Sequence, residues 1–322
     1  MRRREFIALV GGAAACPLVA RAQQPRHTRR IGILLFSKAD YAIVSPFVEG
    51  LEKLGYVGGK AVTIDYRDAG GQYERLPEIA EELVRLNPDL ILAFGGDVAP
   101  IAKQKTSTIP IVAVVSNDPV ASGLVTSLRR PGGNVTGLTQ VHDLLAGKSV
   151  ELLKDVAPRV SRVAILWNPD HADPEFRETQ RASSALGMEL HSLEVRNRRD
   201  FDVAFQTAER DRVEALIVIV SRIVFVNRKL VGDFAQKNNL ILVGVPTWLM
   251  EVGALLSYGP NVPELFGRAS LYADKILKGA RPSDLPMQQP TNFELIINVS
   301  KAKSLGITVP QGVLARADRI ID

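Results

Sequence analysis

Polar and aromatic side chains follow the ends of short apolar segments in both halves of this sequence. In VVSNDPV an apolar run gives way to Ser116, Asn117 and Asp118, and in LWNPD another run closes with Trp167 and Asn168. In open parallel sheets, ligands bind beyond the carboxyl ends of the strands. If both runs are strands, these residues are predicted to contribute to a binding site for a small molecule.

Each stretch also carries a signal for the start of a helix. Asp118 stands directly before Pro119, and Asn168 stands directly before Pro169. Asp or Asn followed by Pro at the first helical position is typical of helix N-termini. Two such termini facing one another would offer free backbone N–H groups to an anion. The alternative is that each is a purely structural cap, as occurs in any α/β protein.

The same rule extends the predicted site to the ends of the other apolar runs. Gly96 would let the backbone approach a ligand; the alternative is that it serves only a turn. Asp97 is expected to cap the next helix. The two tryptophans of the chain are both expected at strand ends, where a ring can stack on a planar ligand, although core packing is the ordinary role of tryptophan. The predicted ligand contacts are Ser37, Tyr41, Gly96, Asp97, Ser116, Asn117, Asp118, Trp167, Asn168, Ser221, Arg222, Thr247 and Trp248.

The sequence holds few residues that suggest catalysis. The four histidines are His27, His142, His171 and His191. They include no pair at i and i+4 and no H-E-x-x-H motif, and only His171 is expected near the site. The sequence has no G-x-S-x-G elbow and no P-loop, and FGGDVAP lacks the dinucleotide-binding pattern. We therefore predict no enzyme, no catalytic residue, no cofactor and no metal; an enzyme with a site built from backbone groups is the alternative.

Apolar runs of about six residues predict strands that are buried on both faces. The runs are IGILLF (31–36), DLILAF (89–94), PIVAVV (110–115), RVAILW (162–167), ALIVIV (215–220) and LILVGV (240–245). Segments with helical periodicity separate them, among them PFVEGLEKLGY, YERLPEIAEELVRL and VNRKLVGDFAQKNN. This alternation predicts an α/β fold made of right-handed βαβ units.

The runs of the two halves correspond to one another. Strands expected near positions 31, 62, 90 and 111 have counterparts 125 to 131 residues later, without a repeat at the level of residues. This spacing predicts two similar doubly wound lobes with parallel sheets. RRPGGNVTG and LLSYGPNV are the expected passages between them. We assign 28–140 plus 262–290 to the N-terminal lobe and 141–261 plus 291–322 to the C-terminal lobe.

The first residues have the pattern of an export signal. Residues 1–22 have a charged start, an apolar middle and a small-x-small exit, and Arg3-Arg4 fits a twin-arginine signal. An uncleaved anchor, or a lipid on Cys16, the only cysteine, are the alternatives. Removing residues 1–22 takes away four arginines and one glutamate and lowers the net charge from +5 to +2. That charge gives no case for nucleic acid as a partner.

Several long stretches resemble the substrate-binding proteins of ABC importers, in the group that includes tryptophan- and tyrosine-type binding proteins. They are MRRREFIALVGGAAA, SNDPVASGLVTSLRRPGGNVTGLT, GKSVELLKDVAPRVSRVAILWNP, the segment from LLSYGPNVPELFGRASLYADKILKG to NVSKAKSLGITVP, and LARADRIID. The resemblance implies two lobes of the type I periplasmic-binding-protein fold joined by a hinge of several crossovers. It also implies membrane permease and ATPase partners.

The sequence departs from this family after ALIVIV. The family usually continues with proline and aspartate, whereas Ser221 and Arg222 stand here. An arginine at a cleft can hold a carboxylate with two parallel hydrogen bonds. We therefore hypothesise a ligand that carries a carboxylate and lacks the ammonium of an amino acid. The alternative is an exposed arginine at a strand end.

Together these features predict a monomeric periplasmic protein that closes on a small carboxylate-bearing ligand, an amino acid or an aromatic or organic acid. A ligand-sensing receptor subunit without transport is an alternative with the same architecture. A transcription regulator would need a DNA-binding module of about 50–60 residues before the first strand, but only 30 residues precede Ile31.

Overall fold

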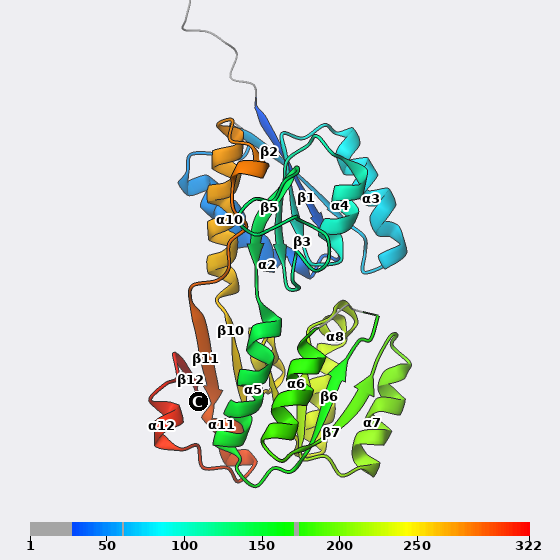
Figure 1. Cartoon of the computed structure of the whole chain (residues 1–322), viewed down its shortest axis with the longest axis vertical. Coiled ribbons are helices and arrows are strands. Elements are labelled where there is room, and N and C mark those ends of the chain that lie inside the picture. Colours follow the sequence, from blue (N-terminus) through cyan, green and yellow to red (C-terminus); the bar gives the residue numbers. More distant parts are fainter. Residues whose placement is uncertain (1–27, 60, 171–173) are drawn as a thin grey trace, which may run out of the picture.

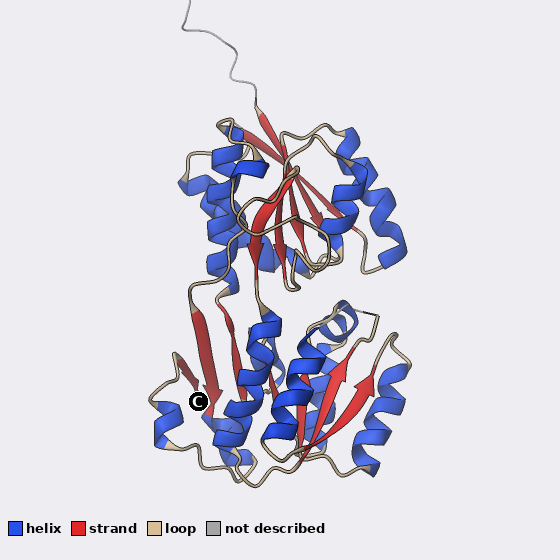
Figure 2. Ribbon diagram, in the orientation of Figure 1, coloured by secondary structure: helices blue, strands red, loops and turns tan. Residues whose placement is uncertain are grey.

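The computed structural model describes residues 28–59, 61–170 and 174–322. The predicted signal at 1–22, Cys16, His27 and His171 lie outside these residues. The chain forms two lobes, each with a central sheet covered by helices on both faces (Figures 1 and 2). Both lobes are of the α/β class that the apolar runs predicted.

The first lobe is built on five parallel strands in the order β2-β1-β3-β4-β5. The strands are β1 (Arg29–Leu35), β2 (Val62–Asp68), β3 (Leu90–Phe94), β4 (Ile111–Val115) and β5 (Val135–Thr139). Helices α2 (Asp40–Lys53) and α10 (Val262–Leu277) pack together on one face, and α3 (Leu76–Arg85) and α4 (Val98–Lys105) cover the other (Figure 1). A one-turn helix, η1 (Tyr73–Arg75), precedes α3.

Apolar side chains at helical spacing bury the inner faces of these helices. Leu76, Ile79, Ala80 and Leu83 of α3 are all buried, as the periodicity predicted. Helix α2 begins six residues before the predicted start and includes Pro46 in its interior. The Ser45 hydroxyl donates to the Ala42 carbonyl, 2.9 Å away. That carbonyl is the one that Pro46 leaves without its usual helical N–H.

The second lobe is built on seven strands in the order β12-β11-β10-β9-β8-β6-β7. They are β6 (Arg162–Trp167), β7 (Glu189–Glu194), β8 (Ala215–Val218), β9 (Ile241–Gly244), β10 (Leu256–Pro260), β11 (Phe293–Asn298) and β12 (Arg319–Ile321). All neighbours are parallel except β10 and β11, which run antiparallel. The parallel part was predicted; β11 and β12 come from the C-terminal segment.

Helices cover both faces of this second sheet. Helix α5 (His142–Val156) packs against α6 (Pro174–Ala185), and α7 (Asp200–Arg210) and α9 (Arg228–Lys237) contribute to the core on the opposite face. Shorter helices of this lobe are α8 (Arg222–Val226), η2 (Thr247–Val252), α11 (Val299–Ser304) and α12 (Gln311–Leu314), whereas η3 (Pro282–Asp284) packs against β5 of the first lobe. Helices α8 and η2 follow β8 and β9 directly, at the end of the sheet that faces the first lobe (Figure 1).

The described chain passes between the lobes three times: between β5 and α5, between β10 and α10, and between η3 and β11 (Figure 1). LLSYGPNV contains the second passage, as predicted. RRPGGNVTG does not contain the first, because the chain still forms β5 before it leaves the lobe. The passage follows at Gln140 and Val141. Val141 is buried, and its φ of 49° places a β-branched residue in the left-handed region, where such residues are rare.

Candidate functional site

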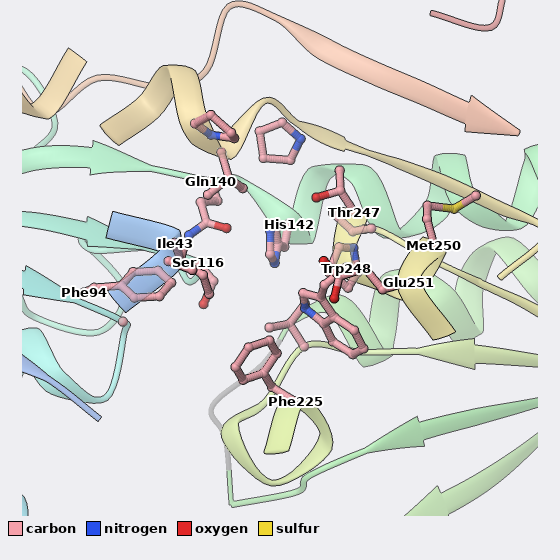
Figure 3. Close-up of a pocket in the computed structure, with 18 of the residues that line it drawn as sticks. Ile43, Phe94, Ser116, Gln140, His142, Phe225, Thr247, Trp248, Met250 and Glu251 are labelled. Carbon is pink, nitrogen blue, oxygen red and sulfur yellow. The ribbon is translucent and has the colours of Figure 1, made fainter. Parts of the chain in front are cut away.

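A cavity of about 490 Å³ lies between the two lobes (Figure 3). Its walls come from strand ends and helix starts of both sheets, and its size lies within the usual range for small-molecule sites. Of the residues predicted from the sequence, those that line it are Gly96, Asp97, Ser116, Ser221, Arg222, Thr247 and Trp248. The carboxyl ends of the parallel strands therefore do meet around one cavity.

Aromatic rings from both lobes form much of its wall. Phe94 at the end of β3 comes from the first lobe, and Phe225 in α8 and Trp248 in η2 come from the second (Figure 3). Phe225 and Trp248 meet edge to face, with ring centroids 5.5 Å apart. Ile43 and Met250 add aliphatic and thioether surface. The cavity is thus suited to a ligand with a planar or apolar part.

Neutral polar groups face the same space. Ser116, Gln140 and Thr247 line it, and the labelled side chains of Gln140 and Thr247 stand on opposite sides of His142 (Figure 3). The Ser221 hydroxyl is buried and has no hydrogen-bond partner among the described residues. A buried hydroxyl without a partner costs free energy, so a ligand atom that bonded it would remove that cost.

A partly buried ion network crosses from one lobe to the other. Arg222, the first residue of α8, donates from Nη1 to Asp40 Oδ1 at 3.0 Å and from Nε to Asp97 Oδ2 at 3.2 Å. Its Nη2 donates to the Phe94 carbonyl at 2.8 Å. Asp40 is fully buried and also accepts from the N–H groups of Phe36 and Ser37, both at 3.1 Å. The network therefore ties the start of α8 to the starts of α2 and α4.

Burial and charge act against each other within this network. Burial raises the pKa of Asp40 above its ordinary value, although the nearby Arg222 charge acts to lower it. Burial alone would lower the pKa of Arg222, but Asp97 and Asp40 together hold it above its ordinary value. Arg222 therefore keeps its positive charge at the edge of the cavity.

The role predicted for Arg222 is different from the one its geometry shows. The sequence suggested a guanidinium free to hold a ligand carboxylate. Instead, all three of its nitrogens donate to acceptors of the first lobe. In this arrangement the protein itself supplies the carboxylates that Arg222 binds.

Six predicted contacts do not line the cavity: Ser37, Tyr41, Asn117, Asp118, Trp167 and Asn168. Tyr41 donates to Asp68 Oδ2 at 3.0 Å on the surface of the first lobe. Trp167 stacks on Phe176 with centroids 4.2 Å apart and donates to the Ser192 hydroxyl at 2.8 Å. The Ser37 hydroxyl is buried, and the Asn117 amide occupies the place that a Cβ on Gly96 would take.

The two Asx-Pro stretches do not begin helices. Asp118 accepts from the N–H groups of Val120 and Ala121, at 2.7 and 3.2 Å, within a series of turns. Asn168 accepts from the Asp170 N–H at 2.9 Å, and α6 begins only at Pro174. Both side chains bond backbone groups of their own loops, so neither serves as the predicted helix cap. Asp97 does cap α4, through the Val98 N–H at 3.1 Å.

Several lining residues were not predicted. Phe94 was assigned only to its strand, and Phe225 and Glu251 lie a few positions beyond the strand-end residues. Gln140 and His142 lie at the first passage between the lobes, and His142 Nδ1 is 3.7 Å from Glu175 Oε1 in the buried space between α5 and α6. Phe225 and Glu251 lie in the short helices that follow β8 and β9, so a prediction extended through those helices would include both residues. No sequence signal marked His142.

Within residues 28–59, 61–170 and 174–322, no cluster of His, Cys, Asp and Glu could hold a metal ion. No helix in the same part of the chain is long and apolar enough to cross a membrane.

Known proteins of similar sequence bind aromatic amino acids. A tyrosine-binding protein of Clostridioides difficile is 26% identical over 261 residues, which cover 80% of this chain and 75% of that protein. A Streptococcus pneumonia ABC domain in complex with L-Trp matches with a TM-score of 0.84 and 25% identity, over 91% of this chain and all of that one. A leucine-binding protein of Thermotoga maritima, 14% identical at a TM-score of 0.55 over 80% of this chain and 78% of that one, shares the fold.

A further solved structure matches with a lower score. A ligand-free, open substrate-binding protein from Clostridium difficile covers the same 91% of this chain, and 99% of its own length, at 26% identity. Its TM-score is only 0.68.

The family model described as ABC transporter substrate binding protein matches residues 31–321. Its members bind a substrate for a transporter and do not convert it. The two lobes, the cavity between them and this match together show that the chain belongs to the family of ABC transporter substrate-binding proteins.

Proposed function

We propose that this protein captures a small aromatic compound with a carboxylate, an amino acid or an aromatic acid, and delivers it to a permease and ATPase in the membrane. The observation that carries the proposal is the cavity between the lobes, with Phe94 on one side and Phe225 and Trp248 on the other. The relatives that bind tyrosine and L-Trp support an aromatic ligand.

Capture follows from the position of the cavity. A ligand that touches both lobes binds the closed form better than the open one and shifts the population by that difference in affinity. The three passages between the lobes form the hinge. The transporter would then recognise the closed form.

A carboxylate has one other arginine available in the wall. Arg319 in β12 lines the cavity, is exposed, and forms no ion pair with the described residues. Its guanidinium can donate hydrogen bonds to a carboxylate at the side of the cavity nearest to β11. The Ser221 hydroxyl and the Gln140 amide supply hydrogen bonds to other polar atoms of the ligand.

Export places the protein where an importer needs it. The signal features of residues 1–22 support secretion to the periplasm through the twin-arginine route, with cleavage after Ala22. The exported protein would act as a monomer.

Thermal denaturation with a panel of aromatic amino acids, aromatic acids and aliphatic carboxylates tests the ligand class. A ligand at one hundred times its dissociation constant stabilises the folded state by about 2.7 kcal/mol. We expect the largest rise in melting temperature with aromatic carboxylates. A rise only with sugars or aliphatic acids would contradict the aromatic assignment.

Intrinsic fluorescence gives a second check, because the chain has two tryptophans in different places. Trp248 lines the cavity, whereas Trp167 is held by Phe176 and Ser192 outside it. We expect an aromatic ligand to change the emission of the wild type and of Trp167→Phe, and Trp248→Phe to lose most of that change. A response that survives in Trp248→Phe and disappears in Trp167→Phe would place the ligand elsewhere.

A further inference from the structure

The first lobe carries a receptor for a cation at the edge of the cavity. Asp40 at the start of α2 and Asp97 before α4 point two carboxylates at one position, and the Phe94 carbonyl points there as well. The Phe36 and Phe94 rings flank the same position, with centroids 5.2 and 5.0 Å from the guanidinium carbon that fills it. Carboxylates, a carbonyl and aromatic faces are the groups that bind ammonium and guanidinium ions.

Arg222 of the second lobe occupies this receptor. Gly95 makes room for it: its φ is +116°, and a Cβ built there would lie 2.3 Å from Arg222 Nη2. Gly95, Asp97 and Phe94 also line the ligand cavity. The receptor is therefore continuous with the cavity, and a ligand cation could reach it if Arg222 were absent.

We propose that Arg222 determines specificity by filling the cation receptor formed by Asp40, Asp97, Phe36 and Phe94, so that the protein selects aromatic acids over the corresponding amino acids. This inference rests on the proposed binding of an aromatic carboxylate in the same cavity. A ligand ammonium would have to displace a guanidinium that already has three hydrogen bonds. An acid without the amine meets no such competition.

Matched compounds test the proposal by isothermal titration calorimetry. 3-Phenylpropionate and L-phenylalanine differ by one ammonium, as do indole-3-propionate and L-tryptophan, and phenethylamine carries the ammonium alone. We expect the wild type to bind the better acid at least about tenfold more tightly than its amino acid, the factor for one lost charged hydrogen bond. Equal affinity, or preference for the amino acid, would overturn the inference.

Removing the guanidinium should open the receptor. Arg222→Met keeps a long, unbranched side chain without the charge. We expect it to bind phenethylamine and the two amino acids at least about tenfold more tightly than the wild type does. Adding Asp97→Asn should reverse this gain. Arg181→Met is the control, since Arg181 is exposed on α6, pairs with Glu178 and does not line the cavity, and it should leave affinity for the amines unchanged.

The two experiments separate this inference from the proposed function. If the wild type binds none of the acids but Arg222→Met gains affinity for the amines, the result contradicts the proposed aromatic carboxylate ligand and supports the cation receptor. If folded Arg222→Met gains no affinity for any amine, the result contradicts the proposed cation receptor, whatever the wild type binds. If Arg222→Met does not fold, the comparison of acids with amino acids in the wild type still decides.

Discussion

Replacing Asp40 by alanine is expected to lower the free energy of unfolding by about 3–5 kcal/mol, the range for removing one partner of a buried ion pair. Asp40 is fully buried and accepts from Arg222 and from the Phe36 and Ser37 N–H groups. Alanine leaves all three donors without this acceptor. Urea denaturation followed by circular dichroism measures the loss.

Two control variants separate charge from hydrogen bonding. Asp40→Asn keeps an acceptor oxygen and is expected to lose less stability than Asp40→Ala. Asp233→Ala removes an exposed ion pair with Lys229 of similar length, 2.7 Å, and is expected to cost at most about 1 kcal/mol. If Asp40→Ala costs no more than Asp233→Ala, the network does not stabilise the protein as its geometry indicates.

Gly137→Ala is expected to be more damaging, with a loss on the order of 4 kcal/mol or more. Gly137 lies in β5 opposite Ala113 of β4, with φ of +142°. An added Cβ would lie 1.9 Å from the Ala113 carbonyl oxygen, and that contact is with backbone and cannot be relieved by a side-chain rotation. Most of the variant should be insoluble on expression, and any soluble part should unfold at a much lower urea concentration.

Gly133 provides the matched control for this substitution. It precedes β5 by two residues, a Cβ added there would have no atom within 4 Å, and its φ does not favour glycine. Gly133→Ala should therefore be soluble and within about 0.5 kcal/mol of the wild type. Comparable stability of the two alanine variants would show that β5 can shift relative to β4.

The fold was largely predictable because buried parallel strands carry their signal within a few residues. Runs such as PIVAVV and RVAILW are apolar at every position after the first, and each forms a strand. The direction of β11 was not predictable. Its residues show which faces are buried, but whether a strand runs parallel or antiparallel depends on partners far away in the sequence.

The sequence predicted that the site lies at the carboxyl ends of the strands, but not which side chains there face the cavity. Gly96, Ser221 and Trp248 follow strand ends and line the cavity, whereas Trp167 also stands at a strand end and turns away. The difference lies with its neighbours, because Ser192 on the adjacent strand and Phe176 on the next helix hold the ring. The sequence does not show that Arg222 reaches Asp40, since 182 residues separate them.

The left-handed backbone at Val141 bears on the release of a bound molecule. Such a conformation costs about 1–3 kcal/mol and persists only where the surrounding structure enforces it. Here the bond from the Gln140 N–H to the Val115 carbonyl, 2.8 Å long, and the burial of the Val141 side chain enforce it at the passage from β5 to α5. A separation of the lobes that let Val141 return to an extended conformation would recover that energy. The strain at the first passage would then favour the separated lobes over the arrangement seen here.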